Sequence, residues 1–213
     1  MTRLTAPCLA FYATLLVTAA LFAVLLYLPY EAAERINVEG GLVETLSAIL
    51  SFVSFGILLG KGEIVAWPFA VMLLAFGLRE LDLDKKPFTE GLLKSRQYIG
   101  DTVPMPERVI SAVVLITILI AFVLTIKRGA KPLMRGLANQ NGIAWCVGLA
   151  LVLAVTAKTV DGLARKLEPF GIALSETLSK NLALYEETAE LGMALALLFA
   201  VFAWFPKQTH DDI

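Results

Sequence analysis

The sequence predicts an all-α fold: a polytopic membrane protein built as a six-transmembrane-helix bundle with short amphipathic surface helices. Of its 213 residues, 58% are hydrophobic and only 17% are charged, and the mean hydropathy is +0.74. A soluble domain is typically about 45–50% apolar and about 25% charged. The apolar residues also fall in long blocks, which is the signature of membrane spans. We expect one integral membrane domain over residues 1–213.

The first three predicted spans cover residues 9–29, 42–60 and 64–78. The first is longer than the roughly 7–15 residues of a signal-peptide core, and residues 30–34 after it make a poor small-residue cleavage site, so we expect it to stay uncleaved. The third is shorter than the about 20 residues that cross a bilayer. Arg79 and Glu80, at its end, are therefore expected at or slightly inside the membrane boundary, where ionisable groups are costly and often functional.

The last three predicted spans cover residues 109–126, 143–160 and 189–205. A short surface helix is expected over residues 88–99, before the fourth span. A basic loop follows that span. Residues 163–178 carry apolar side chains at three- and four-residue steps, which predicts two short amphipathic surface helices. We expect the second to continue through Glu186 into the sixth span.

Six spans place both termini on the same side of the membrane. The basic loop (Lys127, Arg128, Lys131 and Arg135) shares that side, and the positive-inside rule makes it cytoplasmic. Trp67, Trp145 and Trp204 would then all lie at the cytoplasmic interface, where tryptophan belts form. The predicted location is the bacterial inner (plasma) membrane, because no other targeting signal is present.

Composition excludes several classes of site. The net charge is −1, so there is no basic footprint for nucleic acid. Cys8 and Cys146 have neither metal-binding nor redox spacing. His210 is the one histidine, which excludes a zinc site built on several histidines. The expected partner is the lipid bilayer, and the sequence leaves open whether the chain forms a homo-oligomer.

Acidic residues gather at the outer ends of the second, third, fifth and sixth predicted spans. Like charges three residues apart on one helix repel each other. In a low-dielectric setting, that repulsion must be relieved by a cation, a metal or proton uptake. The candidate cation or metal ligands are Glu44, Glu80, Asp82, Asp161, Glu187 and Glu190. Arg79 and Lys158 lie at the same level and are candidate partners or substrate-binding groups.

Two serines extend this candidate site into the second span. Ser47 and Ser51 follow Glu44 at three- and four-residue steps, so the three share one helix face. They are candidate substrate-binding residues that would line a cavity. The alternative is a packing face, since small hydroxyl residues let membrane helices approach closely.

The function we predict is binding or transport of a cation or small solute. Carboxylates and hydroxyls form an all-oxygen ligand set that suits protons, Na⁺ or a divalent cation. One alternative is an enzyme that acts on a lipid or lipid-linked headgroup, with paired carboxylates as acid and base and Arg79 on a phosphate. The second alternative is a non-catalytic scaffold or assembly protein, whose acids only form ion pairs between helix ends. No motif is specific enough to name a family or assign catalytic residues.

Overall fold

The computed structural model describes residues 6–29, 32–33, 36, 40–62, 64–99 and 101–204, and this part of the chain is helical without strands. The long helices are α1 (Ala6–Tyr27), α3 (Leu42–Gly60), α4 (Trp67–Glu80), α6 (Met105–Ala138), α7 (Gly142–Val160) and α9 (Glu176–Ala203). Short elements join them: the 3₁₀ turns η1 (Ile64–Ala66) and η2 (Glu168–Phe170), and the helices α5 (Arg96–Ile99) and α8 (Leu163–Leu167). The predicted all-α class is confirmed.

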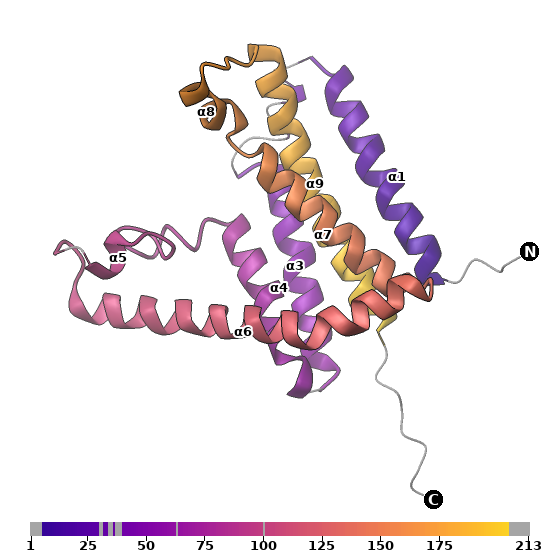
Figure 1. Ribbon diagram of the computed structural model, residues 1–213, viewed down its shortest axis with the longest axis horizontal. Coiled ribbons are helices and arrows are strands. Elements are labelled where there is room, and N and C mark those ends of the chain that lie inside the picture. Colours follow the sequence, from indigo (N-terminus) through magenta and orange to yellow (C-terminus); the bar gives the residue numbers. More distant parts are fainter. Residues whose placement is uncertain are drawn as a thin grey trace, which may run out of the picture.

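Helix α9 lies at the centre of the bundle, in contact with α1, α3 and α7 (Figure 1). Its buried face is rich in small residues, including Ala189, Gly192 and Ala196. A Cβ on Gly192 would lie 3.0 Å from Leu153 Cδ1 and would also strike Thr18 of α1. Membrane helices associate through such small residues because they let the backbones approach closely. The small residues of α9 therefore determine how closely α1 and α7 pack on it.

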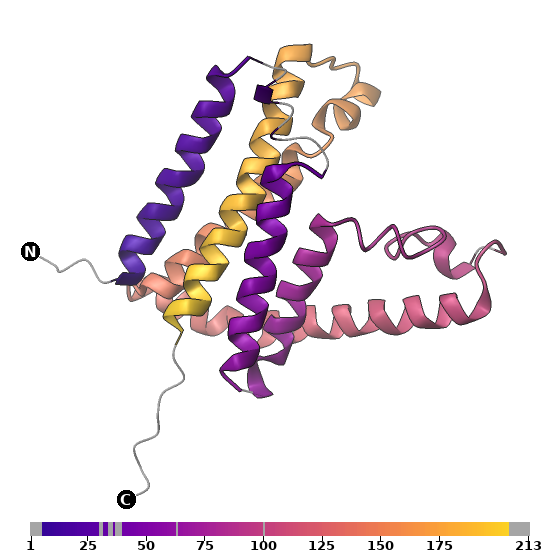
Figure 2. The same cartoon turned by 180° about the vertical axis from the view of Figure 1, so that it is seen from behind.

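Helices α3 and α4 form an antiparallel pair beside α9 (Figure 2). Ser47, Ser51 and Ser54 lie on the buried face of α3. The hydroxyl of Ser47 donates to the carbonyl of Val43, and Ser54 similarly bonds the preceding turn of its own helix. The hydroxyls of Ser47 and Ser54 are therefore satisfied within α3, which lets its polar face pack inside the bundle.

Helix α6 runs across the other helices instead of alongside them (Figure 1). Its C-terminal part packs on α4 and α7, with Gly129 against Phe69 and Gly136 against Ala144. The prediction that the basic residues from Lys127 to Arg135 form a loop is wrong, because residues 127–138 continue α6 as helix. This segment is rich in strong helix formers. Its two glycines also give it a surface that packs closely on the bundle.

Within the described residues, four helices are long and apolar enough to cross a membrane: Cys8–Tyr27, Leu42–Gly60, Met105–Ala138 and Gly142–Val160. They agree with four of the predicted spans and indicate a membrane-embedded protein. Helix α4 has only 14 residues. The predicted sixth span is the second half of α9, whose first half carries several charges. The count of six spans is not confirmed.

The predicted surface helices are shorter than expected. Of residues 88–99, only Arg96–Ile99 are helical. Gly91 in the preceding turns has a φ of +95°, which a continuous right-handed helix does not allow. Residues 163–178 form α8, η2 and the start of α9. Pro169 lies in η2, two residues after the end of α8, and Gly171 adopts a φ of +74° at the end of η2, so the chain turns there. As expected, α9 then runs without a break past Glu186.

Candidate functional site

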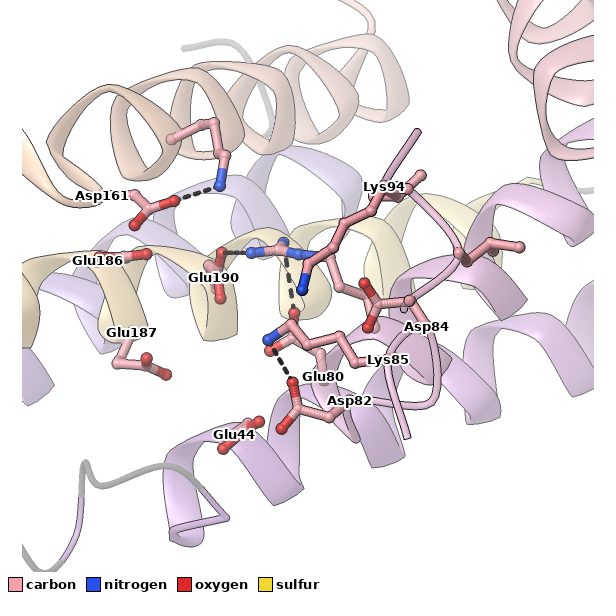
Figure 3. Close-up of a pocket in the computed structure, with 15 residues that line it drawn as sticks. Glu44, Glu80, Asp82, Asp84, Lys85, Lys94, Asp161, Glu186, Glu187 and Glu190 are labelled. Atoms are coloured by element: carbon pink, nitrogen blue, oxygen red, sulfur yellow. Dashed lines mark hydrogen bonds and ion pairs between the residues drawn. The ribbon is translucent and has the colours of Figure 1, made fainter. Parts of the chain in front are cut away.

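A pocket of about 430 Å³ opens where α3 begins, where α4 and α7 end, and beside the middle of α9 (Figure 3). The loop after α4 forms its remaining wall. Eight acidic side chains line it: Glu44, Glu80, Asp82, Asp84, Asp161, Glu186, Glu187 and Glu190. Four basic side chains also line it: Arg79, Lys85, Lys94 and Lys158. All six candidate acids, Arg79 and Lys158 therefore lie around one pocket.

The end of α4 directs the chain over this pocket. Asp82 adopts a left-handed conformation with φ +54°. Its N–H donates to the carbonyl of Arg79, and the N–H of Leu83 donates to the carbonyl of Leu78, each at 2.9 Å. These two bonds form a Schellman motif, which ends a helix and reverses the chain. Asp tolerates the left-handed region better than most residues, so the same residue ends α4 and supplies a carboxylate to the pocket.

The loop that follows is bonded to the start of α6. The carboxylate of Glu107 accepts from the backbone N–H of Thr89 at 2.6 Å and from the Gln97 side-chain amide at 2.9 Å. Gln97 is fully buried and also accepts from the N–H of Glu90 at 2.9 Å. These bonds fix the loop on α6 and thereby determine the position of the pocket wall that it forms.

Arg79 joins α4 to α9 inside the pocket. Its Nη2 lies 2.9 Å from Glu190 Oε1, and its Nη1 lies 3.7 Å from Glu80 Oε1. Both carboxylates are buried, with 6% of Glu80 and 8% of Glu190 exposed. One guanidinium therefore serves two buried acids, and the closer contact goes to Glu190.

Two other acids have lysine partners on their own elements. Asp82 lies 2.6 Å from Lys85 Nζ, and this hydrogen bond lowers the pKa of the Asp82 carboxyl. Asp161, just after α7, accepts from Lys158, and this bond likewise lowers the pKa of Asp161. Both acids are therefore ionised and locally neutralised at neutral pH.

Glu44, Glu186 and Glu187 have no basic partner in an ion pair among the described residues. Glu44 accepts a hydrogen bond from the backbone N–H of Gly40. Burial, together with the neighbouring charges of Glu190 and Glu186, raises the pKa of Glu187 to about 8. Burial and the charge of Asp161 raise the pKa of Glu186 to about 7. This side of the pocket has an excess of carboxylates.

Glu80 also resists ionisation, although Arg79 is near it. Burial and the charge of Glu190 raise its pKa to about 8, although the attraction of Arg79 partly opposes them. Glu80, Glu186 and Glu187 lie outside the four helices of spanning length. Near neutral pH, these three carboxyls are poised between the protonated and ionised forms.

The carboxylates surround the pocket without converging on one point. Within the described residues, no group of three His, Cys, Asp or Glu side chains is placed to hold a metal ion. Ser47 and Ser51, the other candidate substrate-binding residues, are buried in the α3 packing face and do not line the pocket. The residues that do line it offer dispersed carboxylate oxygens, which suit a hydrated or extended cation better than a tightly coordinated one.

Sequence reasoning did not include Glu186, Asp84, Lys85 or Lys94 among the site residues. Glu186 adjoins Glu187, next to the predicted sixth span, so its position was a usable signal. The three loop residues reach the pocket only because the loop turns back at Asp82 and is bonded to α6 through Glu107. No pattern in the sequence encodes that long-range contact.

No family model matches the chain, and neither a similar curated protein nor a similar solved structure was found.

Proposed function

We propose that this membrane protein binds a cation or small cationic solute in the acidic pocket. The observation that supports this is the charge balance of the lining, where eight acidic side chains face four basic ones. These acids come from the helices α3, α4 and α9, from the loop after α4, and from Asp161 just after α7. Such an excess of partly buried negative charge is costly unless protons or a cation neutralise it.

The size of the pocket favours a ligand larger than a bare ion. Its volume of about 430 Å³ lies within the roughly 300–1,000 Å³ of small-molecule sites. Dispersed carboxylates can hold several ammonium groups, or a metal ion that keeps its water shell. We therefore expect organic amines or hydrated cations to bind better than a dehydrated metal ion.

We further propose a six-span topology in the bacterial inner membrane, with both termini in the cytoplasm. The exposed basic residues of α6 support this orientation, because positively charged segments stay on the cytoplasmic side. The proposal requires the apolar half of α6 to turn relative to the bundle, since helices that cross one bilayer run broadly alongside one another. It places the acidic pocket at the outer face.

Thermal unfolding of the purified protein with added cations tests the binding proposal. The probes are Na⁺, Mg²⁺ and the diamine putrescine, each added as the chloride salt. A ligand that binds only the folded state raises the melting temperature as its concentration rises. We expect at least one probe to do so beyond the effect of an equal ionic strength of choline chloride.

Variants identify the site responsible. In Glu187→Gln, the rise of the melting temperature with added cation should be much smaller, because one unpaired carboxylate of the pocket is lost. Glu168→Gln is the matched control, since Glu168 is exposed in η2 and does not line the pocket. If no probe shifts the parent, or if both variants behave alike, the pocket is not a cation site. The acids would then serve only to connect helix ends, as in a scaffold.

A further inference from the structure

A second charged surface lies on the C-terminal part of α6, a helix that does not line the acidic pocket. Four basic residues lie on it, all of them exposed: Lys127, Arg128, Lys131 and Arg135. Their spacings of one, three and four residues put them on one face of the helix. We call this surface the basic face of α6.

The packing of α6 directs this face away from the bundle. Gly129 and Gly136 lie on the other side of the helix, against Phe69 of α4 and Ala144 of α7. A Cβ on Gly129 would lie 3.4 Å from the Phe69 ring, and a Cβ on Gly136 would strike Ala144. The helix therefore cannot turn its basic face inward without losing these close contacts.

Among the described residues, the charges of the basic face have no acidic partner. Lys127, Lys131 and Arg135 form no ion pair within the described part of the chain. Arg128 donates to the backbone carbonyl of Val65 at 2.8 Å and likewise has no ion pair with a described residue. No acid occurs in the sequence between Glu107 and Asp161.

The residues next to the basic face of α6 are of the kinds found at the boundary of a bilayer. The basic face directly follows the apolar half of α6, where Val123 and Ile126 are exposed. Helices α4 and α7 contact α6 near their first residues, through Phe69 and Ala144. The exposed tryptophans Trp67 and Trp145 lie at these same helix starts. Tryptophan gathers at the headgroup level of membranes, and basic clusters beside an apolar helix bind anionic lipids.

We propose that the basic face of α6 binds the phosphate headgroups of anionic phospholipids. The charges complement each other, and each Lys or Arg adds its own attraction at the membrane surface. This inference does not depend on what the acidic pocket binds.

Native mass spectrometry of the purified full chain, titrated with phosphatidylglycerol or phosphatidylcholine, tests the proposal. We expect phosphatidylglycerol to bind more tightly, and this preference to weaken as salt is added, since exposed charges are screened. The variant Lys127→Gln/Lys131→Gln/Arg135→Gln should reduce the affinity for phosphatidylglycerol by roughly tenfold to a hundredfold. Its affinity for phosphatidylcholine should not change.

The control variant Arg96→Gln/Arg165→Gln/Lys166→Gln removes three exposed cations elsewhere and should bind like the parent. Lys127→Arg/Lys131→Arg keeps the charge and should also retain the preference. The proposal is overturned if the parent does not prefer phosphatidylglycerol, or if salt leaves the preference intact. It is equally overturned if the first variant and the control lose the same affinity.

Discussion

At the scale of single residues, Arg79 has the largest structural role in the acidic pocket. It is the last basic residue of α4, and its guanidinium contacts a buried carboxylate on its own helix and another on α9. Its side chain is still 41% exposed, so water screens part of its charge. Arg79 therefore holds two helices together while it remains accessible from the pocket.

Arg79→Gln should lower the free energy of unfolding by about 1–3 kcal/mol. Loss of one partner from a fully buried pair costs roughly 3–5 kcal/mol, and the exposure of Arg79 reduces this. Denaturation in detergent measures the change. Arg96→Gln, at an exposed position in α5, is the control and should change stability little. Equal stability of all three proteins would contradict the role assigned to Arg79.

Glu80→Gln should reduce the pH dependence of stability. The folded-state pKa of Glu80 is about 8 and its ordinary value is 4.5. Between these pH values the folded protein holds a proton that the unfolded chain has lost, so stability falls as pH rises. We expect Glu80 to lower the free energy of unfolding by about 1–3 kcal/mol between about pH 5 and pH 8. Glu80→Gln should lack this contribution to the pH dependence.

The measurement is the unfolding midpoint at several pH values for the parent, Glu80→Gln and Glu168→Gln. The last of these changes an exposed carboxyl outside the pocket and should keep the slope of the parent. A parent that is equally stable across the whole range would refute the raised pKa. A Glu80→Gln slope as steep as that of the parent would assign the effect to other carboxyls.

The sequence was enough to predict most of the residues around the pocket. Each of the six candidate acids stands at or near a boundary between polar and apolar sequence. The alternation of the six predicted spans then puts these boundaries on the same side of the membrane. Ser47 shows where such a prediction fails. Its spacing from Glu44 suggested that it lines the pocket, whereas its hydroxyl donates to the carbonyl of Val43 within α3. Helix periodicity tells which residues share a face, but not whether that face meets a neighbour or a cavity.

At the scale of elements, α9 shows how a charged helix can occupy the centre of a membrane bundle. Glu186, Glu187 and Glu190 of α9 line the pocket, and beyond them its buried positions are filled mainly by small residues. The sequence predicted the helix and its continuity, but not its central place. That place depends on close approaches to three other helices, which no local pattern reports.

Gly192→Ala should destabilise the bundle by about 1–3 kcal/mol, the usual cost of overpacking a close contact. The added methyl group would meet Thr18 and Leu153. Gly56→Ala is the matched control, because a Cβ there has nothing within 4 Å. It should be neutral or slightly stabilising, since alanine is the better helix former. The prediction fails if thermal unfolding places both variants at the same midpoint.

At the scale of the whole molecule, the number of spans depends on α6. Its apolar half is as hydrophobic as a span, yet it lies across the other helices (Figure 1). Hydropathy predicts that this segment enters the bilayer, but not its angle to the bundle. The sequence therefore predicts membrane embedding reliably and the relative orientation of α6 poorly.

Single cysteines, introduced after Cys8 and Cys146 are replaced by alanine, distinguish the topologies. Six spans predict that cysteines at Arg96 and Glu168 react with an impermeant maleimide from one side of the membrane. A cysteine at Arg135 should react from the other side. If α6 does not cross, the cysteine at Arg96 should react from the same side as that at Arg135, and the six-span proposal is then wrong.

The central claim is that the acidic pocket takes up a cation, and calorimetric titration of Mg²⁺ and putrescine tests it most directly. Glu80 and Glu187 hold protons near neutral pH, so a bound cation should displace them. We predict binding that tightens from about pH 6 to about pH 8.5, proton release at the lower pH, and weaker binding in Glu187→Gln. The absence of binding by either probe at both pH values would contradict the claim, as would equal affinity in the variant.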